Sequence, residues 1–224
     1  MLKAIGSSVI FILFFFQLSA QKEVATNNGD TLSSQRYLKP AALIVPGAFL
    51  LYGGLKPAIS GIENLDRRIM DRVVENHPDF VTALPDYLMW APSASVYILD
   101  AVNAKTAHNF KEHLILDAGS IIITGGLGYA MRQMTKNNET FSKEGTKFPS
   151  GHTANAFRGA EIVHQELKKS HPVLSYSGYV IASGVGVLRI YDKAHLLSEV
   201  IAGAGLGILS TKLTYWIFEK GKRK

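Results

Sequence analysis

The sequence predicts an all-α protein, a bundle of about six core helices that is embedded in a membrane or lies against one. Several segments carry apolar residues at helical spacing, and no segment alternates apolar and polar residues as a half-buried strand does. Hydrophobic residues make up 47% of the 224-residue chain and charged residues only 19%, which is apolar for a soluble protein. The mean hydropathy of +0.10 is nevertheless low for a chain made mostly of membrane spans.

The N-terminal end has the layout of a secretory signal peptide. Residues 1–20 contain Lys3, then the apolar run Val9–Phe16, then small residues before the expected cleavage site. An uncleaved membrane anchor is the alternative, and either one takes the chain out of the cytoplasm. We therefore expect a protein of the cell envelope whose site faces the periplasm or the exterior. Residues 21–38 are polar without a clear period, which predicts a linker before one helical domain at 39–224.

The first two segments of this domain differ in character. Pro40–Leu55 is apolar but short for a membrane span, and Pro46 and Gly47 interrupt it. Gly61–His77 has apolar residues at helical spacing with charges between them. This pattern predicts an amphipathic helix at a surface or interface, which ends before Pro78.

Two mainly apolar helices are expected next, at Pro85–Ala104 and His113–Met134. Each contains one acidic residue, Asp100 in the first and Asp117 in the second. A carboxylate at membrane depth is costly, so we expect each to face the bundle interior or to lie near an interface.

Three more helices are expected in the C-terminal part. The first begins at the stretch Pro149–His152, after a polar loop. Ser175–Leu188 is rich in glycine and serine, and such small residues allow close helix packing. His195–Phe218 is the longest apolar run, and Tyr215 and Trp216 near its end are expected at the membrane interface.

Composition excludes several kinds of site. The chain has no cysteine, so disulfides, cysteine-bound metals, thiol nucleophiles and a lipid anchor on cysteine are ruled out. The net charge is +6, but the basic residues are scattered, so no nucleic-acid partner is expected. No metal site is expected, because the remaining histidines lack partners at metal-ligand spacing and are interpreted as structural or exposed: His77, His108, His113, His164 and His171.

The stretch Pro149–His152 reads Pro-Ser-Gly-His and combines features of an anion site. Ser150 suits an N-cap, and Gly151 lets the backbone approach a ligand closely. A helix N-terminus offers free amide donors and the positive end of the dipole, which suit a phosphate oxyanion. His152 in the first turn is placed to donate a proton to a leaving oxygen. The alternative is an ordinary helix start with a structural histidine nearby.

A second set of charged residues accompanies the start of the last helix. His195 and Glu199 are four residues apart, so on a helix they share a face and the carboxylate can accept from one imidazole nitrogen. The other nitrogen is then free to attack as a nucleophile. Arg189 can bind phosphate oxygens through its fork of donors, and Asp192 is a candidate N-cap of the last helix. The alternative is a solvated surface ion pair.

These residues resemble the motifs of the type 2 phosphatidic acid phosphatase superfamily, which is similar in fold to the vanadium haloperoxidases. The family is marked by K-x6-R-P, then P-S-G-H, then S-R-x5-H-x3-D. P-S-G-H is intact at Pro149–His152. The third motif keeps its spacing from Arg189 to His195 to Glu199, where glutamate replaces the family's aspartate. Leu188 stands in place of the family's serine.

The resemblance implies a bundle of six core helices and a phosphatase site without a metal. In that site His195 is the nucleophile that forms a phosphohistidine, and His152 is the acid that protonates the leaving alkoxide. Arg189, Ser150 and the Gly151 amide hold the phosphate. No cofactor is implied, although vanadate is expected to act as an inhibitor or phosphate mimic.

The first family motif is degenerate in this chain. Gly128 stands where the family has lysine, Thr135 where it has arginine and Lys136 where it has proline. Arg132 lies about 40° and Lys136 about 80° around the helix axis from position 128. We therefore expect Arg132 and Lys136 to replace the lost cations in part. The alternative is that this motif has simply been lost.

The function expected from these motifs is hydrolysis of phosphomonoesters on membrane lipids or lipid-linked diphosphates. The substrate would be a phospholipid or an isoprenoid phosphate. The alternative is a weakened or inactive member of the fold that binds phosphate-bearing lipid or has a structural role in the envelope. Vanadate-dependent haloperoxidase chemistry is disfavoured, because a tightly held vanadate needs the missing cations.

Overall fold

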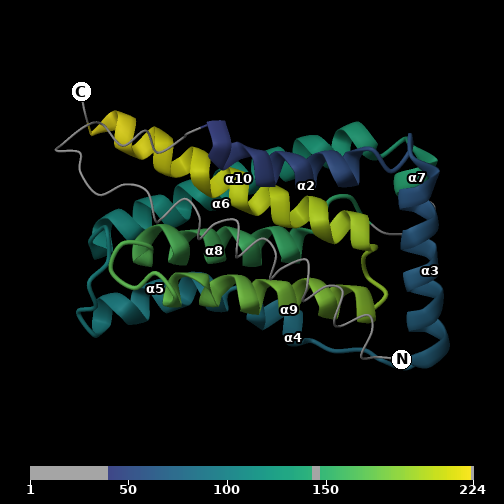
Figure 1. Ribbon diagram of the computed structural model, residues 1–224, viewed down its shortest axis with the longest axis horizontal. Helices are drawn as coiled ribbons and strands as arrows, with labels where there is room; N and C mark the ends of the chain where they lie inside the picture. The colour runs from purple at the N-terminus through teal and green to yellow at the C-terminus, as the bar shows by residue number, and fades with distance from the viewer. Residues whose placement is uncertain (1–39, 143–146, 223–224) are drawn as a thin grey trace. The chain divides into compact units, whose positions relative to one another are not determined.

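The computed structural model describes residues 40–142 and 147–222, and the expected signal peptide and linker lie outside them. Within these ranges the secondary structure is helical throughout, which confirms the all-α prediction (Figure 1). The elements in chain order are η1 Pro40–Leu43, α2 Ile44–Gly54, α3 Ser60–Asn76, α4 Leu84–Leu88, α5 Ala91–Ala101, α6 Phe110–Thr135, α7 Glu139–Ser142, α8 Gly151–Leu167, η2 Leu174–Tyr176, α9 Ser177–Tyr191 and α10 Leu197–Gly221.

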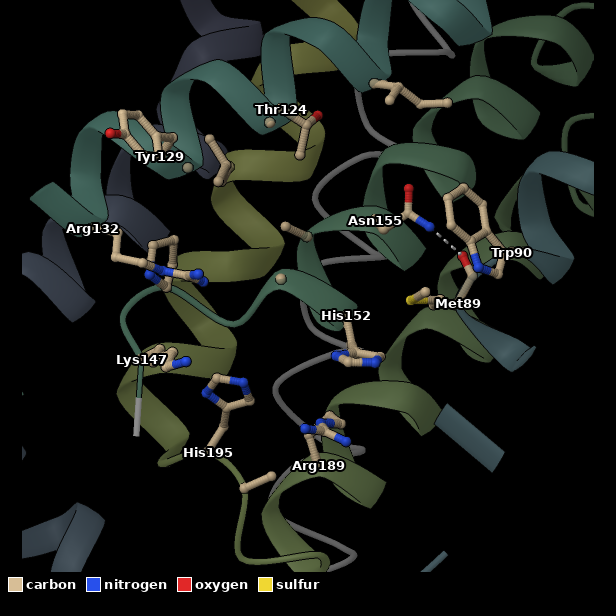
Figure 2. A pocket seen from close by; sticks show the side chains of 18 residues that line it. Met89, Trp90, Thr124, Tyr129, Arg132, Lys147, His152, Asn155, Arg189 and His195 are labelled. Carbon is tan, nitrogen blue, oxygen red and sulfur yellow. Dashed lines mark hydrogen bonds between the residues drawn. The ribbon is translucent and has the colours of Figure 1, made fainter. Parts of the chain in front are cut away.

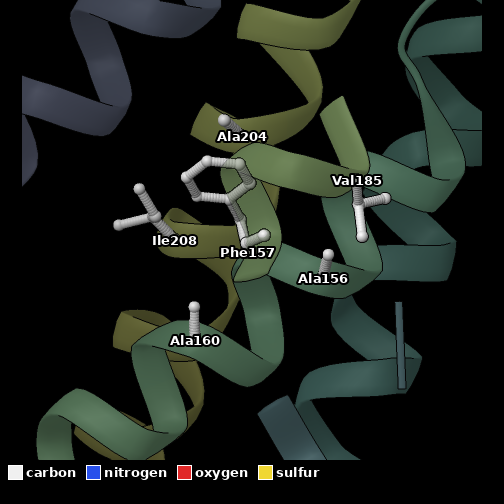
Figure 3. Close-up of a cluster of buried hydrophobic side chains, with 7 residues drawn as sticks. Ala156, Phe157, Ala160, Val185, Ala204 and Ile208 are labelled. Carbon is white, nitrogen blue, oxygen red and sulfur yellow. The ribbon is translucent and has the colours of Figure 1, made fainter. Parts of the chain in front are cut away.

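Helix α8 is the central helix of the bundle. It packs against α9 and α10 and is also in contact with α5 and α6, and α2 lies on α10 (Figure 1). Small side chains of α8 and α9 meet Phe157 of α8 and Ile208 of α10 in one core cluster (Figure 3). Its small members let the three helices approach closely, and they are Ala156, Ala160, Ala182, Val185 and Ala204.

Glycines in α10 and α9 are required at the helix crossings. A Cβ on Gly207 would lie 2.2 Å from the carbonyl oxygen of Ala154 in α8. A Cβ on Gly178, in the segment predicted to pack closely, would lie 2.8 Å from Ala160 Cα. Real Cβ atoms do not approach this closely, so these glycines set the distances between the helix axes.

Two proline-containing segments differ from expectation. The single helix expected at Pro85–Ala104 is two helices, α4 and α5, separated at Met89 and Trp90. Pro92 is the second residue of α5, where it has no N–H for a bond to the preceding turn and its ring excludes a continuous helix. Pro46 does not interrupt α2, because it lies in the first turn, where backbone N–H groups have no intrahelical partner anyway.

The amphipathic helix predicted at Gly61–His77 is confirmed as α3, which ends at Asn76 directly before His77 and Pro78. It buries only three residues, Ile62, Asp66 and Val73. In Figure 1 it crosses the end of the bundle at which α10 begins.

The acidic residues of the apolar helices, expected to face the bundle interior or an interface, are paired across helices. Asp100 Oδ2 accepts from His113 Nδ1 at 2.7 Å, and Asp117 forms an ion pair with the fully buried Arg158. The interfacial position expected for Tyr215 is wrong. This side chain is 1% exposed, and its hydroxyl donates to Glu166.

Two helices in the described part of the chain, α6 and α10, are long and apolar enough to cross a membrane. Helix α10 is mostly buried within the bundle, whereas α6 is mostly exposed. Its outward side chains include Ile115 and Ile122, which are 57% and 72% exposed. The bundle therefore presents an apolar outer surface along α6.

Gly207→Ala is expected to destabilise the bundle. The added methyl forces α8 and α10 apart, and overpacking of this kind costs about 1–3 kcal/mol. The measurement is the thermal unfolding midpoint of the purified protein in detergent. Gly184→Ala is the matched control, because a Cβ there meets nothing within 4 Å and alanine favours a helix. Equal midpoints for both variants would contradict the packing role of Gly207.

Candidate active site

A pocket of about 640 Å³ opens where the start of α8, the end of α9 and the segment before α10 meet the middle of α6 (Figure 2). It contains both histidines of the sequence motifs, and its lining is Met89, Trp90, Ile121, Thr124, Gly125, Gly128, Tyr129, Arg132, Lys147, Pro149, Gly151, His152, Ala154, Asn155, Arg189, Ala194, His195 and Leu206. One end of the pocket is cationic and the other is apolar.

His195 and Glu199 are in contact, although not on a common helix face. Helix α10 begins at Leu197, so His195 lies before the helix and the expected shared face is wrong. Glu199 Oε2 instead reaches back past the helix start to His195 Nδ1 at 2.9 Å and to the Leu196 N–H at 3.2 Å. Glu199 is fully buried and His195 is 7% exposed. Nδ1 is therefore held, and Nε2 is the imidazole nitrogen left for a ligand.

The segment between α9 and His195 folds back on the end of α9. The carbonyl oxygen of Arg189 accepts from the N–H groups of Ala194 and His195 at 3.1 and 3.2 Å. Asp192 is the C-cap of α9 rather than an N-cap of α10, and its Oδ1 accepts from the Thr82 N–H at 2.9 Å. The turn is thereby tied to the chain between α3 and α4.

Lys193 fixes the same turn from its other side. Its backbone has φ 56°, a left-handed conformation that is uncommon outside glycine. Its ammonium donates to three carbonyl oxygens, those of His77 at 3.1 Å, Pro78 at 2.8 Å and Phe80 at 3.2 Å. No local sequence pattern predicts this contact, because the residues involved are more than a hundred positions apart.

Ser150 is at the N-cap position of α8, as expected, but its side chain does not cap the backbone. Its Oγ lies 2.9 Å from Thr153 Oγ1, and its N–H donates to the carbonyl oxygen of Glu199 at 3.1 Å. Gly151 lines the pocket. The backbone bond joins the two motif-bearing segments directly.

Arg189 has donor capacity that protein groups do not use. Its Nε is buried and has no hydrogen-bond partner among the described residues, and its Nη1 lies 3.8 Å from Asp192 Oδ2. Buried donors are normally satisfied, so an unused one at a pocket wall suits an anionic ligand. A phosphate oxygen has the charge and the acceptor sites to bind there.

His152 has a partner that the sequence motifs did not reveal. Its Nε2 lies 2.7 Å from Oδ1 of Asp86 in α4. Burial and the charge of Arg189 lower the pKa of His152, whereas the contact with Asp86 opposes that shift. The sequence places Asp86 in the first turn after Pro85, but nothing local to that turn predicts a contact with α8.

The cations around the pocket differ in part from those expected. Arg132 lines the pocket, but Lys136, the C-cap of α6, is not among its lining residues. Lys147 lines the pocket instead, and sequence reasoning missed it although it stands two residues before Pro149. In Figure 2 the side chains of Arg132 and Lys147 extend toward the space beside His195.

The two neutral positions of the first motif have other surroundings. Gly128 lines the apolar part of the pocket, where an added Cβ would lie 3.4 Å from Leu206 Cδ2. The Thr135 hydroxyl donates to the Met131 carbonyl oxygen at 3.0 Å, one turn earlier in α6. Neither position carries a charge to the pocket.

The start of α10 is anchored to α3 by a buried carboxylate. Asp66 accepts from the N–H of Ser198 at 2.9 Å and from its hydroxyl, and Lys56 Nζ lies 3.7 Å from Asp66 Oδ2. Burial raises the pKa of Asp66. Because Ser198 immediately precedes Glu199, this contact helps to hold the carboxylate that orients His195.

No group of three or more histidines and carboxylates in the described ranges is arranged to hold a metal ion. His108 and His113 instead contact one carboxylate, Glu166, at the C-terminal end of α8. His108 Nδ1 lies 2.9 Å from Glu166 Oε1, and His113 Nε2 lies 3.0 Å from Oε2. These histidines pair with an acidic residue inside the bundle, away from the first turn of α8.

The described part of the chain is all-α, with a pocket lined by histidines and arginines. The profile of the PAP2 superfamily matches residues 121–223, which include both of the recognised motifs. This match confirms the predicted resemblance to the superfamily.

Two known proteins are similar to the chain. It is 36% identical over 104 residues to the lipid A 1-phosphatase of Porphyromonas gingivalis, which is 46% of this chain. The chain spans only 23% of the length of that relative. The fold is also similar to the crystal structure of a transmembrane PAP2 type phosphatidylglycerolphosphate phosphatase from Bacillus subtilis, with a TM-score of 0.47. The two sequences are 21% identical, and the match covers 79% of this chain and 96% of the other.

Lys193→Ala is expected to loosen the turn that carries His195. The substitution removes the ammonium that donates hydrogen bonds to three carbonyl oxygens, and this loss costs about 1–3 kcal/mol of stability. Hydrogen exchange of residues 77–82 and 190–196 measures the local effect, with faster exchange expected in both segments. Lys169→Ala, an exposed lysine beyond α8, is the control and should leave both segments unchanged. Unchanged exchange in Lys193→Ala would contradict the bracing role.

Proposed function

We propose that the protein is a metal-independent phosphatase that hydrolyses phosphomonoesters through a phosphohistidine at His195. The observation that carries this proposal is the combination of two groups in one pocket. Nδ1 of His195 is held by a buried carboxylate, and Arg189 offers a buried Nε–H that no described residue accepts. A nucleophile beside an unused cationic donor suits attack on a phosphoryl group.

The two histidines divide the reaction between them. His195 Nε2 attacks phosphorus as the bond from phosphorus to the leaving oxygen breaks, and His152 gives that oxygen its proton. In the second step His152 takes a proton from water, whose oxygen attacks phosphorus and displaces His195. Glu199 stabilises the charge on the His195 ring and keeps Nε2 directed at the substrate.

The phosphate oxygens would be bound by Arg189, by the Gly151 amide at the start of α8, and by Ser150. We assign the role of the missing first-motif cations to Arg132 and Lys147, since both line the pocket. Lys136, which the sequence suggested for this role, is outside the pocket lining. The phosphate thus meets positive charge from α6, from the segment before α8 and from α9.

The substrate class we propose is a phosphate carried by a membrane lipid or a lipid-linked diphosphate. The pocket continues from the cationic end into an apolar region formed by residues such as Ile121 and Leu206, which suits a lipid. The outer face of α6 is apolar and exposed, which supports a position in the bilayer. The name of the lipid A 1-phosphatase relative adds phosphorylated lipid A to the candidates. Export by the predicted signal peptide would place the site on the periplasmic or exterior side.

His195→Ala is expected to abolish phosphate release. The wild type should release inorganic phosphate from at least one of phosphatidate, phosphatidylglycerol phosphate, lipid A and undecaprenyl diphosphate. Loss of the nucleophile should lower kcat by at least about 10³-fold. Acid-labile phosphohistidine trapped on the wild type, and absent from His195→Ala, is the direct signature of the intermediate.

Two treatments bear on the mechanism in the same assay. EDTA should leave the rate unchanged, and orthovanadate should inhibit by occupying the phosphate position. His171→Ala, at an exposed histidine beyond α8, is the matched control for histidine removal. Equal rates for wild type and His195→Ala would exclude the mechanism. Binding of these lipids without any turnover would identify the protein as the inactive member of the fold.

Arg132→Ala and Lys147→Ala are each expected to weaken turnover. Each removes a cation that stabilises phosphoryl charge, and because both side chains are exposed the loss in kcat/KM should be about tenfold each. Lys111→Ala, an exposed lysine at the other end of α6, is the control and should retain wild-type kcat/KM. A larger loss in Lys136→Ala than in Lys147→Ala would contradict the assignment of Lys147.

A further inference from the structure

His152 is paired with a carboxylate outside the three family motifs. Asp86 is the third residue of α4, and its Oδ1 lies 2.7 Å from His152 Nε2. The side chain of His152 is 29% exposed and that of Asp86 is 57% exposed. His152 lines the pocket, and Asp86 contacts it from α4, outside the pocket lining.

The position of Asp86 depends on the break between α4 and α5. The helix expected at Pro85–Ala104 is interrupted at Met89 and Trp90, and the short helix α4 that results contacts α9 and α8. The Asn155 side chain of α8 donates to the Met89 carbonyl oxygen at 3.3 Å. Asn155 lies one turn after His152 in α8, so this bond ties the end of α4 to the helix that carries His152.

Apart from Asp86, the groups that act on His152 or share its pocket are cations or the titratable His195. Arg189 from α9 and His195 from the segment before α10 both disfavour its protonated form. Arg132 from α6 and Lys147 from the segment before α8 line the same pocket. Asp86 is the acidic partner that α4 supplies against this set. An acid catalyst in such surroundings loses its proton easily unless an anion stabilises the charged ring.

We propose that Asp86 is a positioning residue that holds His152 in its protonated, correctly oriented form for the acid step of catalysis. The inference rests on the proposed phosphatase function. The site then contains two histidine–carboxylate pairs, one for the nucleophile and one for the acid. Each carboxylate engages one ring nitrogen and leaves the other for chemistry.

The contact also selects the atom that transfers the proton. His152 Nε2–H donates to Asp86, so the proton given to the leaving oxygen comes from Nδ1. After the transfer His152 is neutral, with its remaining hydrogen on Nε2 toward Asp86. Nδ1 is then a free base that accepts the proton of the attacking water in the second step, which returns His152 to its starting form.

Asp86→Asn is expected to change the pH dependence of turnover rather than the rate at every pH. Asp86 favours protonated His152, so its loss lowers the pH at which the acid is deprotonated. The falling, high-pH limb of kcat/KM should therefore move to lower pH by about half a unit to one unit, as suits a partly exposed pair. Above that limb kcat/KM should fall about three- to tenfold, whereas at pH well below it the variant should match the wild type.

Two control variants separate this role from general charge and from folding. Asp79→Asn removes the same charge from an exposed site between α3 and α4 and should leave the profile unchanged. Asp86→Glu should restore most of the high-pH limb. A loss that is equal at every pH, or an equal shift in Asp79→Asn, would overturn the proposal. The thermal unfolding midpoint of Asp86→Asn should match that of the wild type.

Titration of His152 by NMR tests the pair without any turnover. With labelled histidine, the midpoint assigned to His152 should be lower in Asp86→Asn than in the wild type or in Asp79→Asn. An unchanged midpoint would refute the proposal even if the enzyme is active. If the wild type releases no phosphate, the proposed function fails, and a lowered midpoint would still establish the Asp86–His152 pair.

Discussion

One backbone hydrogen bond joins the two halves of the candidate site. The N–H of Ser150 at the start of α8 donates to the carbonyl oxygen of Glu199 in the first turn of α10 at 3.1 Å. This approach requires Gly203, where a Cβ would lie 2.6 Å from the Ser150 carbonyl oxygen. The side chain of the same Glu199 holds His195. The spacing between the Pro149–His152 turn and His195 is therefore set by the packing of two helices rather than by a loop.

The bundle buries some of its charges as ion pairs and exposes apolar side chains along α6. Arg158 is fully buried and pairs with Asp117, and Asp66 is buried beside Lys56. Buried charges are tolerated only when paired, and a broken pair costs more than the pair contributes. These contacts therefore specify which helix faces meet. The exposed apolar side of α6 suits contact with lipid.

The degenerate first motif illustrates how an anion site can change its residues and keep its chemistry. A phosphate needs positive charge nearby, whichever segment supplies it. Gly128 brings no charge to the apolar part of the pocket, whereas Arg132 and Lys147 line its cationic end. Sequence alignment to the motif finds a loss at Gly128 because it compares positions along the chain. Lys147, from another part of the chain, lines the same pocket, and under the proposed function it supplies positive charge that Gly128 lacks.

The sequence by itself determined the helical class, the approximate extents of α3 and α6, the start of α8, the intact P-S-G-H motif and the spacing of the third motif. Helical periodicity and caps are local, and the motif residues are close in the chain, so no tertiary information was needed. It misplaced Asp192 and the helix start near His195, because a turn tied to residues over a hundred positions away has no local signature. The contact of Asp86 with His152 and the place of Lys147 in the pocket were decided only by the tertiary structure. Both depend on how segments distant in the chain pack together, and local sequence patterns do not predict that packing.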